Sequence, residues 1–190
     1  IHYVGLGLQD TKFEEAYSSD SGRAIETMRI LLNEHPEGKK IPYHVDPRIR
    51  EWCFGSLEGA YDAEMWGVLP RVLNFKTEDD LFATDVSFEE IANAVEGADT
   101  ANWAEPYTQL RDRVWNGFED IAQNREKQGG GNVLIVSHGL TIAFLLSLID
   151  SKQPVRANLL NGSINRLRYE NGEFSIRAIN DISYMERGKT

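Results

Sequence analysis

Three side chains, Arg23, Glu51 and His138, have types that could act together on a phosphoryl group. An arginine and a histidine can neutralise the charge of such a group, and a carboxyl can protonate the leaving oxygen. Each of the three is expected where a strand or a loop ends. The set indicates phosphoryl transfer, but it lacks a nucleophile to attack the phosphorus.

His138 follows the apolar run Val133–Val136, in which three of the four residues are β-branched, as is typical of a buried strand. Residues 141–149 continue as an apolar helix. A histidine at such a junction either caps the helix or lies in the crevice where open α/β sheets bind ligands. The spacing alone leaves both interpretations open.

Arg23 and Glu51 each have a plain interpretation beside the chemical one. Arg23 is either a surface arginine in the first turn of a helix or an anion clamp, assisted by the free amides of that helix. Glu51 is either a solvated carboxylate paired with a neighbouring arginine or a general acid, partly desolvated by Trp52 and Phe54. The residues alone favour the arginine pair.

Other catalytic and metal-binding motifs are missing from the sequence. There is no G-x-S-x-G serine motif, no Walker phosphate loop and no H-E-x-x-H metal motif. The histidines show no metal-ligand spacing with cysteine or carboxylate; they are His2, His35, His44 and His138. We therefore expect neither a metal nor another cofactor.

The patterns of hydrophobic residues alternate between strands and helices along the chain, which predicts an α/β fold with a mostly parallel central sheet. Pro42 cannot donate to a strand ladder, so its strand is expected at an edge. The polar tail from Met185 is expected to fray. Strands are expected at 13–19, 41–45, 133–136 and 174–179, with a hairpin turn at 170–173. Helices are expected at 23–33 and 107–128, and residues 1–9 read like the end of another helix.

The net charge of −10 is concentrated in one stretch of the 190 residues. Between Glu58 and Glu105 there are twelve acidic residues, opposed only by Arg71 and Lys76. Such a surface argues against a nucleic acid or an anionic membrane as partner. No apolar run reaches membrane-spanning length and no signal peptide is visible, which with the single cysteine predicts a cytoplasmic protein.

Three segments give the sequence a specific resemblance to one family. Ser18–Thr27 resembles the S-S-x-x-x-R-A-x-x-T segment of the histidine phosphatase superfamily, the phosphoglycerate mutase-like family. Arg50–Gly59 is similar to its R-E-x-x-F-G-x-x-E-G segment, and Val136–Gly139 to its V-S-H-G segment. Asn161–Ser163 resembles a small loop common in the family. The three motifs occur in the family's order and span most of the chain.

The resemblance implies a fold and a set of roles. The fold would be a three-layer α/β sandwich of one domain, residues 1–190, with an acidic helical insertion at about 60–105 acting as a cap. Arg23 would bind the phosphoryl group and Glu51 would donate a proton to the leaving alkoxide. His138 would stabilise the transition state. Gly139 and Ser163 would help to bind a small phosphorylated substrate, and a homodimer is an open alternative to a monomer.

The family nucleophile is a histidine in an R-H-G motif at the end of the first, central strand, and this sequence has none. His2, in what reads as a helix, is no substitute. Either a segment with R-H-G precedes Ile1, or the chain has been shortened, or the protein is a non-catalytic relative. The first is favoured, because losing a central strand would unpair its neighbours. We therefore expect either a strand from outside residues 1–190 or an interrupted sheet, and no activity from residues 1–190 alone.

The choice between phosphatase and mutase rests on the acidic insertion. A mutase holds its substrate and returns the phosphoryl group to it, which requires more basic contacts than a phosphatase needs. An acidic cap is poorly suited to a doubly anionic phosphoglycerate, and the segment Phe54–Gly59 is closer to the phosphatase branch. We expect hydrolysis of a small phosphomonoester; the alternatives are phosphoglycerate mutase activity or phosphate binding without catalysis.

Overall fold

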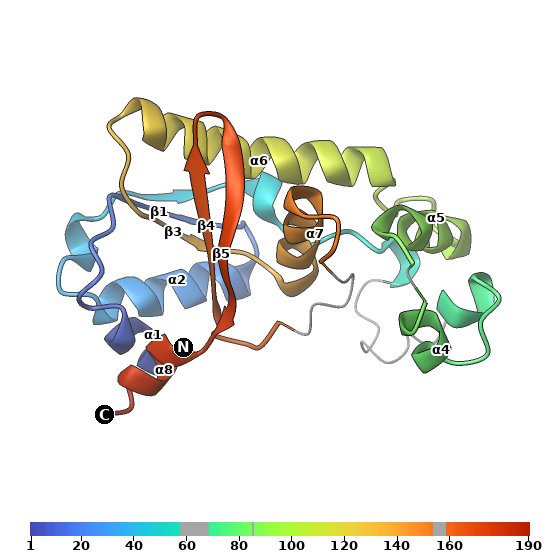
Figure 1. Cartoon of the computed structure of the whole chain (residues 1–190), viewed down its shortest axis with the longest axis horizontal. Coiled ribbons are helices and arrows are strands. Elements are labelled where there is room, and N and C mark those ends of the chain that lie inside the picture. The colour runs from blue at the N-terminus through green and yellow to red at the C-terminus, as the bar shows by residue number, and fades with distance from the viewer. Residues whose placement is uncertain (58–68, 85, 154–158) are drawn as a thin grey trace.

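The structure is a computed structural model, and it describes residues 1–57, 69–84, 86–153 and 159–190 (Figure 1). Its strands are β1 (Glu15–Ser18), β2 (Tyr43–Val45), β3 (Val133–Val136), β4 (Ile164–Glu170) and β5 (Glu173–Asp181). Its helices are α1 (His2–Gly7), α2 (Gly22–Glu34), α4 (Glu78–Phe82), α5 (Phe88–Ala98), α6 (Tyr107–Lys127), α7 (Gly139–Ile149) and α8 (Ser183–Arg187). The expected alternation of strands and helices, and with it the α/β class, is confirmed.

The central sheet has the order β2-β1-β3, and all its strands are parallel. β2 lies at the edge, as Pro42 predicted. Side chains on the two faces enter different cores: Ala16 and Leu134 pack with α1, α2 and α8, whereas Tyr17 and Ile135 face α6 and α7. Figure 1 shows the resulting layers, with α6 on one side of the strands and α2 on the other.

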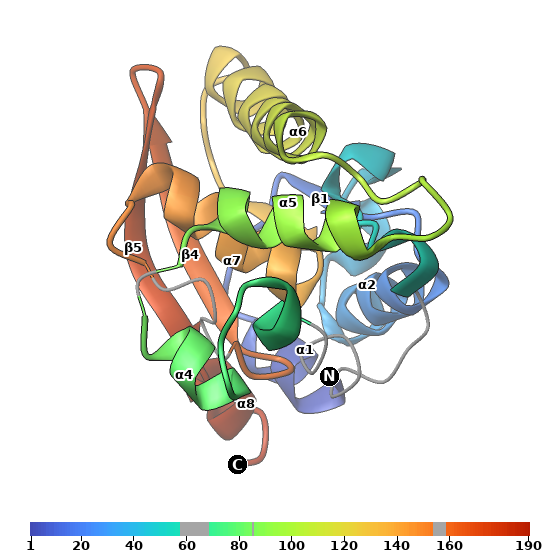
Figure 2. The same ribbon diagram turned by 90° about the vertical axis from the view of Figure 1, so that its right-hand side faces the viewer.

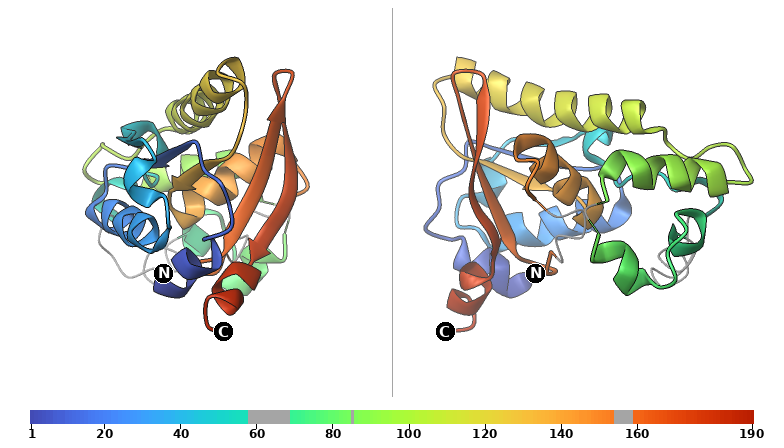
Figure 3. Two further views of the ribbon diagram at one scale, coloured as in Figure 1. Left: turned by 90° about the vertical axis from the view of Figure 1, so that its left-hand side faces the viewer. Right: turned by 45° about the vertical axis from the view of Figure 1, so that its right-hand side comes forward.

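β4 and β5 form a separate antiparallel hairpin. The turn is at Asn171 and Gly172, whose φ angles of 53° and 84° suit a tight hairpin. Figure 3 shows the hairpin standing beside β1–β3 rather than within their sheet. The described residues thus make two sheets instead of one continuous sheet, which confirms the expected interruption. No residue of β4 or β5 is fully buried, although both strands carry apolar side chains.

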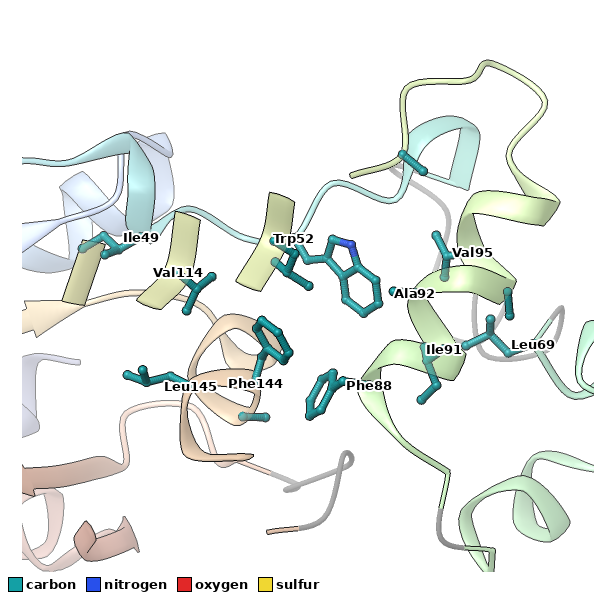
Figure 4. Packing of buried hydrophobic residues seen from close by; sticks show 14 of the residues in the cluster. Ile49, Trp52, Leu69, Phe88, Ile91, Ala92, Val95, Val114, Phe144 and Leu145 are labelled. Carbon is teal, nitrogen blue, oxygen red and sulfur yellow. The ribbon is translucent and has the colours of Figure 1, made fainter. Parts of the chain in front are cut away.

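The larger core joins the body of the protein to the acidic stretch. Trp52, 2% exposed, lies beside Phe144 of α7 and faces α5 (Figure 4). The ring centroids of Phe88 and Phe144 are 4.9 Å apart. In Figure 2, α5 is seen below α6 and in front of α7. α5 begins at a capping box made by Ser87 and Glu90, so both its start and its buried face follow from its sequence.

The expectation that the chain frays from Met185 was wrong. Residues 183–187 form α8, which packs on α1, and both Tyr184 and Met185 contact the smaller core. Two other expectations fall partly outside the described residues. These parts are Glu58 and Gly59 of the second motif and the first part of the acidic stretch. None of the described helices is both long and apolar enough to cross a membrane.

Candidate functional site

The site lies where β1 and β3 end. These neighbouring strands are parallel, so their carboxyl ends lie at the same edge of the sheet, the edge where α/β proteins bind ligands. Arg23, in the first turn of α2, reaches across to His138 after β3. Its Nη2 and Nε donate to Nδ1 of His138 over 3.0 and 3.3 Å. Arg23 is exposed, as its plain interpretation requires, but it is also directed into the site.

His138 occupies the N-cap position of α7, yet its side chain makes no capping hydrogen bond. It is 6% exposed, and its Nε2 lies 2.6 Å from Oγ of Ser19, which is fully buried. His138 is therefore the N-cap residue by position, but its side chain does not serve as the cap. Its ring faces the end of β1, between a serine and an arginine.

Burial is the main cause of an altered pKa at His138, which lies below its ordinary value of 6.5. The nearby charges act in both directions. Glu51 and Asp20 favour the protonated ring, whereas Arg23 and Arg113 oppose it. Since burial dominates, the neutral imidazole is the favoured form.

Glu51 is held at the N-terminus of α7. Its Oε1 accepts from the backbone amides of Thr141 (2.9 Å) and Trp52 (3.1 Å), and its Oε2 accepts from the amide of Leu140 (3.3 Å). The amides of Leu140 and Thr141 are donors that α7 leaves free in its first turn. The expected pairing of Glu51 with a neighbouring arginine is wrong, because Arg50 pairs instead with Asp20.

The loop that carries Glu51 is fastened by an ion pair that the sequence analysis missed. Arg113 of α6 forms two hydrogen bonds with the carboxylate of Glu105, of 2.6 and 2.7 Å. Both side chains are largely buried, 15% and 6% exposed. Nη1 of Arg113 also donates to the backbone carbonyls of Arg48 (2.8 Å) and Arg50 (3.0 Å). The position of Glu51 therefore depends on a residue far away in the sequence.

The next turn of the chain is organised by Asp99. Burial opposes its ionisation, but backbone amides, among them those of Ser56 and Ala104, hold the pKa of Asp99 well below its ordinary value. Gly55 has φ +62°, and a Cβ there would meet the Asp99 carboxylate at 2.2 Å. This turn therefore requires glycine at residue 55.

The two expected binding residues have different placements. Gly139 is the first residue of α7, directly after His138, with open space beside its Cα. Ser163 lies just before β4, and its Oγ is buried without a hydrogen-bond partner among the described residues. Within the described part of the chain, no hydrogen bond joins it to Arg23 or His138.

The remaining histidines lie elsewhere. His2 pairs with Glu34, His35 bonds the carbonyl of Thr11, and His44 stacks with Tyr17 on the far side of β1. No described hydrogen bond links any of them to the site. The described residues also contain no cluster of three side chains suited to a metal ion.

The chain is similar to proteins of known sequence and structure. The chain is 29% identical to the 2,3-bisphosphoglycerate-dependent phosphoglycerate mutase of Cytophaga hutchinsonii, covering 99% of this chain and 79% of that one. It is 32% identical to a phosphoglycerate mutase crystal structure from Bacillus anthracis, with a TM-score of 0.92, covering 100% and 82%. The α-ribazole phosphatase of Shigella flexneri shares the fold, at 21% identity and a TM-score of 0.58, over 95% and 80%. Residues 2–182 match the histidine phosphatase superfamily (branch 1), and the chain belongs to that superfamily.

Proposed function

We propose that the protein hydrolyses a small phosphomonoester through a phosphohistidine intermediate. The observation that carries the proposal is the meeting of Arg23 with His138 at the ends of two parallel strands, next to Glu51. A guanidinium, an imidazole and a carboxyl group supply the three functions that phosphoryl transfer needs besides a nucleophile.

In this proposal Arg23 binds the phosphoryl oxygens with its planar fork of donors. His138 stabilises the negative charge that develops on them. Glu51 protonates the leaving alkoxide and then takes a proton from the attacking water. Its Oε2 has only the longer contact, 3.3 Å from the amide of Leu140, and is the oxygen better placed to carry this proton. Gly139 and Ser163 complete the binding site.

The nucleophile is the missing part. All four histidines of residues 1–190 are described, and only His138 lies in the site. We propose that a further strand, bearing the nucleophilic histidine, lies between β3 and β4. Two features support it. Among the described residues β3 pairs only with β1 and β4 only with β5, so each has an edge whose backbone groups need partners. The buried Oγ of Ser163 beside β4, which has no hydrogen-bond partner in the described part of the chain, would gain one as well.

The charges around the site favour a phosphatase. Among the described residues, the neighbouring arginines are already matched: Arg48 with Asp46, Arg50 with Asp20 and Arg113 with Glu105. Of the arginines that the structure describes near the site, Arg23 faces it with no carboxylate partner among the described residues. One such guanidinium suits one phosphoryl group, whereas a phosphoglycerate carries a second anion.

The likeness to phosphoglycerate mutases favours the second candidate, mutase activity. Incubation with 3-phosphoglycerate distinguishes the two. A phosphatase releases inorganic phosphate, and it should hydrolyse a phosphoester that lacks a second anionic group faster than 3-phosphoglycerate. A mutase yields the 2-phospho isomer without releasing phosphate. We propose in either case that residues 1–190 belong to one domain, with 60–105 as an insertion that caps the site.

Mapping of the phosphorylated residue tests the mechanism. After brief incubation with p-nitrophenyl phosphate and acid-free quenching, mass spectrometry should find phosphohistidine in the protein that contains the additional strand. It should lie on a histidine other than His2, His35, His44 and His138. Residues 1–190 alone should give none. Turnover without phosphohistidine, or phosphohistidine on one of these four, would contradict the mechanism.

The role of Glu51 is tested by Glu51→Gln, which keeps the shape of the side chain but removes its acid. Turnover of alkyl phosphates, whose leaving groups need a proton, should fall much more than turnover of p-nitrophenyl phosphate. An equal loss for both kinds of substrate would rule out Glu51 as the acid.

A further inference from the structure

The two ring nitrogens of His138 have different partners. Nδ1 faces the guanidinium of Arg23, at 3.0 Å from Nη2. Nε2 faces Oγ of Ser19 at 2.6 Å. His138 is 6% exposed and Ser19 is fully buried, so water does not compete freely for the contact between them. The protonation of the ring can therefore be deduced from its partners.

A guanidinium has five N–H donors and no acceptor. Nδ1 must therefore accept the hydrogen bond from Arg23 and carries no proton. A neutral ring then has its proton on Nε2, which donates to Oγ of Ser19. The amide of Ser21 also donates to that oxygen, over 3.3 Å, which agrees with Oγ being an acceptor.

We propose that Ser19 is a positioning residue: Arg23 sets the Nε2–H tautomer of His138, and the Ser19 hydroxyl holds that Nε2–H and thereby keeps Nδ1 turned toward the phosphoryl group. Ser19 lies at the end of β1, held by its amide to the carbonyl of Val136 on β3 (3.1 Å). Its Oγ is thus fixed relative to the strand that carries His138. A serine on one strand orients a histidine on the next.

A consequence follows for phosphate binding, and this step rests on the proposed function. When Arg23 turns its fork to a phosphate, the Nδ1 lone pair would face an anionic oxygen and repel it. Nδ1 then takes a proton from solvent and donates it in a hydrogen bond to the phosphate, while Nε2–H stays on Ser19. The charged groups around the ring that influence this step are Arg23 on α2, Asp20 before it, Glu51 beside α7 and Arg113 on α6.

The test is the tautomer itself, read from long-range proton–nitrogen correlation spectra of protein labelled with 15N-histidine. His138→Asn identifies the signals of His138 among the four histidines. Without phosphate, at pH 8, His138 should show a protonated Nε2 and an acceptor-type Nδ1. A proton on Nδ1 in this state would overturn the proposal without any variant.

Variants separate positioning from mere packing. Ser19→Ala leaves Arg23 in place and should keep the tautomer, but the Nε2 proton of His138 should lose its hydrogen bond and exchange rapidly with solvent. In Ser19→Thr, which keeps the hydroxyl, this proton should stay protected. Ser18→Ala is the control: Ser18 is equally buried, but its Oγ contacts Tyr43 and the backbone carbonyl of Ser19 and not His138. An equally protected Nε2 proton in Ser19→Ala, or an unprotected one in Ser18→Ala, would overturn the proposal.

Addition of inorganic phosphate tests the second step. It should protonate Nδ1 in the wild type, Ser18→Ala and Ser19→Thr. Its affinity should fall roughly fivefold in Ser19→Ala, the factor that corresponds to one net hydrogen bond. If the tautomer is as assigned but phosphate leaves the His138 signals unchanged, the proposed function fails while the assignment of Ser19 stands.

Discussion

The buried ion pair behind the site yields the sharpest stability prediction. Arg113→Met removes the guanidinium but keeps most of the volume of the side chain. It leaves the Glu105 carboxylate, 6% exposed, without its partner, and the carbonyls of Arg48 and Arg50 without a donor. Breaking a buried pair on one side costs about 3–5 kcal/mol. In a protein of this size that lowers the melting temperature by roughly 6–20 °C.

The matched control lies two residues earlier on the same helix. Arg111→Met makes the same substitution on α6, but Arg111 and its partner Asp112 are 46% and 61% exposed. An exposed pair contributes about 0–1 kcal/mol. The loss of unfolding free energy, measured by urea and thermal unfolding, should therefore be several times larger in Arg113→Met than in Arg111→Met. Equal stability changes, or a change under about 1 kcal/mol in Arg113→Met, would show that the buried pair contributes no more than an exposed one.

Two further predictions concern the turn at Gly55 and the ring of His138. Gly55→Ala should destabilise the protein by about 1–3 kcal/mol from its positive φ, with more from the clash with Asp99, as measured by thermal unfolding. Gly172→Ala, with positive φ but open space, should cost less; an equal loss would contradict the clash. Because burial lowers the pKa of His138, the unfolded chain binds more protons than the native protein just below pH 6.5. Stability should therefore fall as pH falls through that window, and His138→Gln should flatten this slope in urea titrations; an unchanged slope would rule out His138 as its source.

Much of the scaffold could be predicted because its signals are local. The β-branched run Val133–Val136, the helix N-termini at Arg23 and His138, and the spacing of α6 each follow from a short window of sequence. Parallel strands then bring residues at their carboxyl ends together, so that Arg23 and His138 could be expected to meet. Asn171 and Gly172 likewise indicate their hairpin turn directly.

The rest depends on contacts between distant segments. The position of Glu51 is decided by amides of α7 and by Arg113, neither of which its own neighbours reveal. The helix at Ser183–Arg187 forms because α1 covers it, whereas its five residues alone indicate no stable helix. Ser19 was part of the first motif, but its contact with His138 needs the register of β1 on β3. Two adjacent small polar residues at a strand end were the only local signal.

The proposed binding of the phosphoryl group by Arg23 is tested by one comparison of variants. Arg23→Ala and Arg29→Ala make the same change on α2, but Arg29 is exposed and forms an ion pair with Glu26. In the protein that contains the nucleophile, hydrolysis of p-nitrophenyl phosphate should fall by about 100- to 1,000-fold in Arg23→Ala. Arg29→Ala should hydrolyse it at the wild-type rate. Wild-type turnover in Arg23→Ala would rule out Arg23 as the side chain that binds the phosphoryl group.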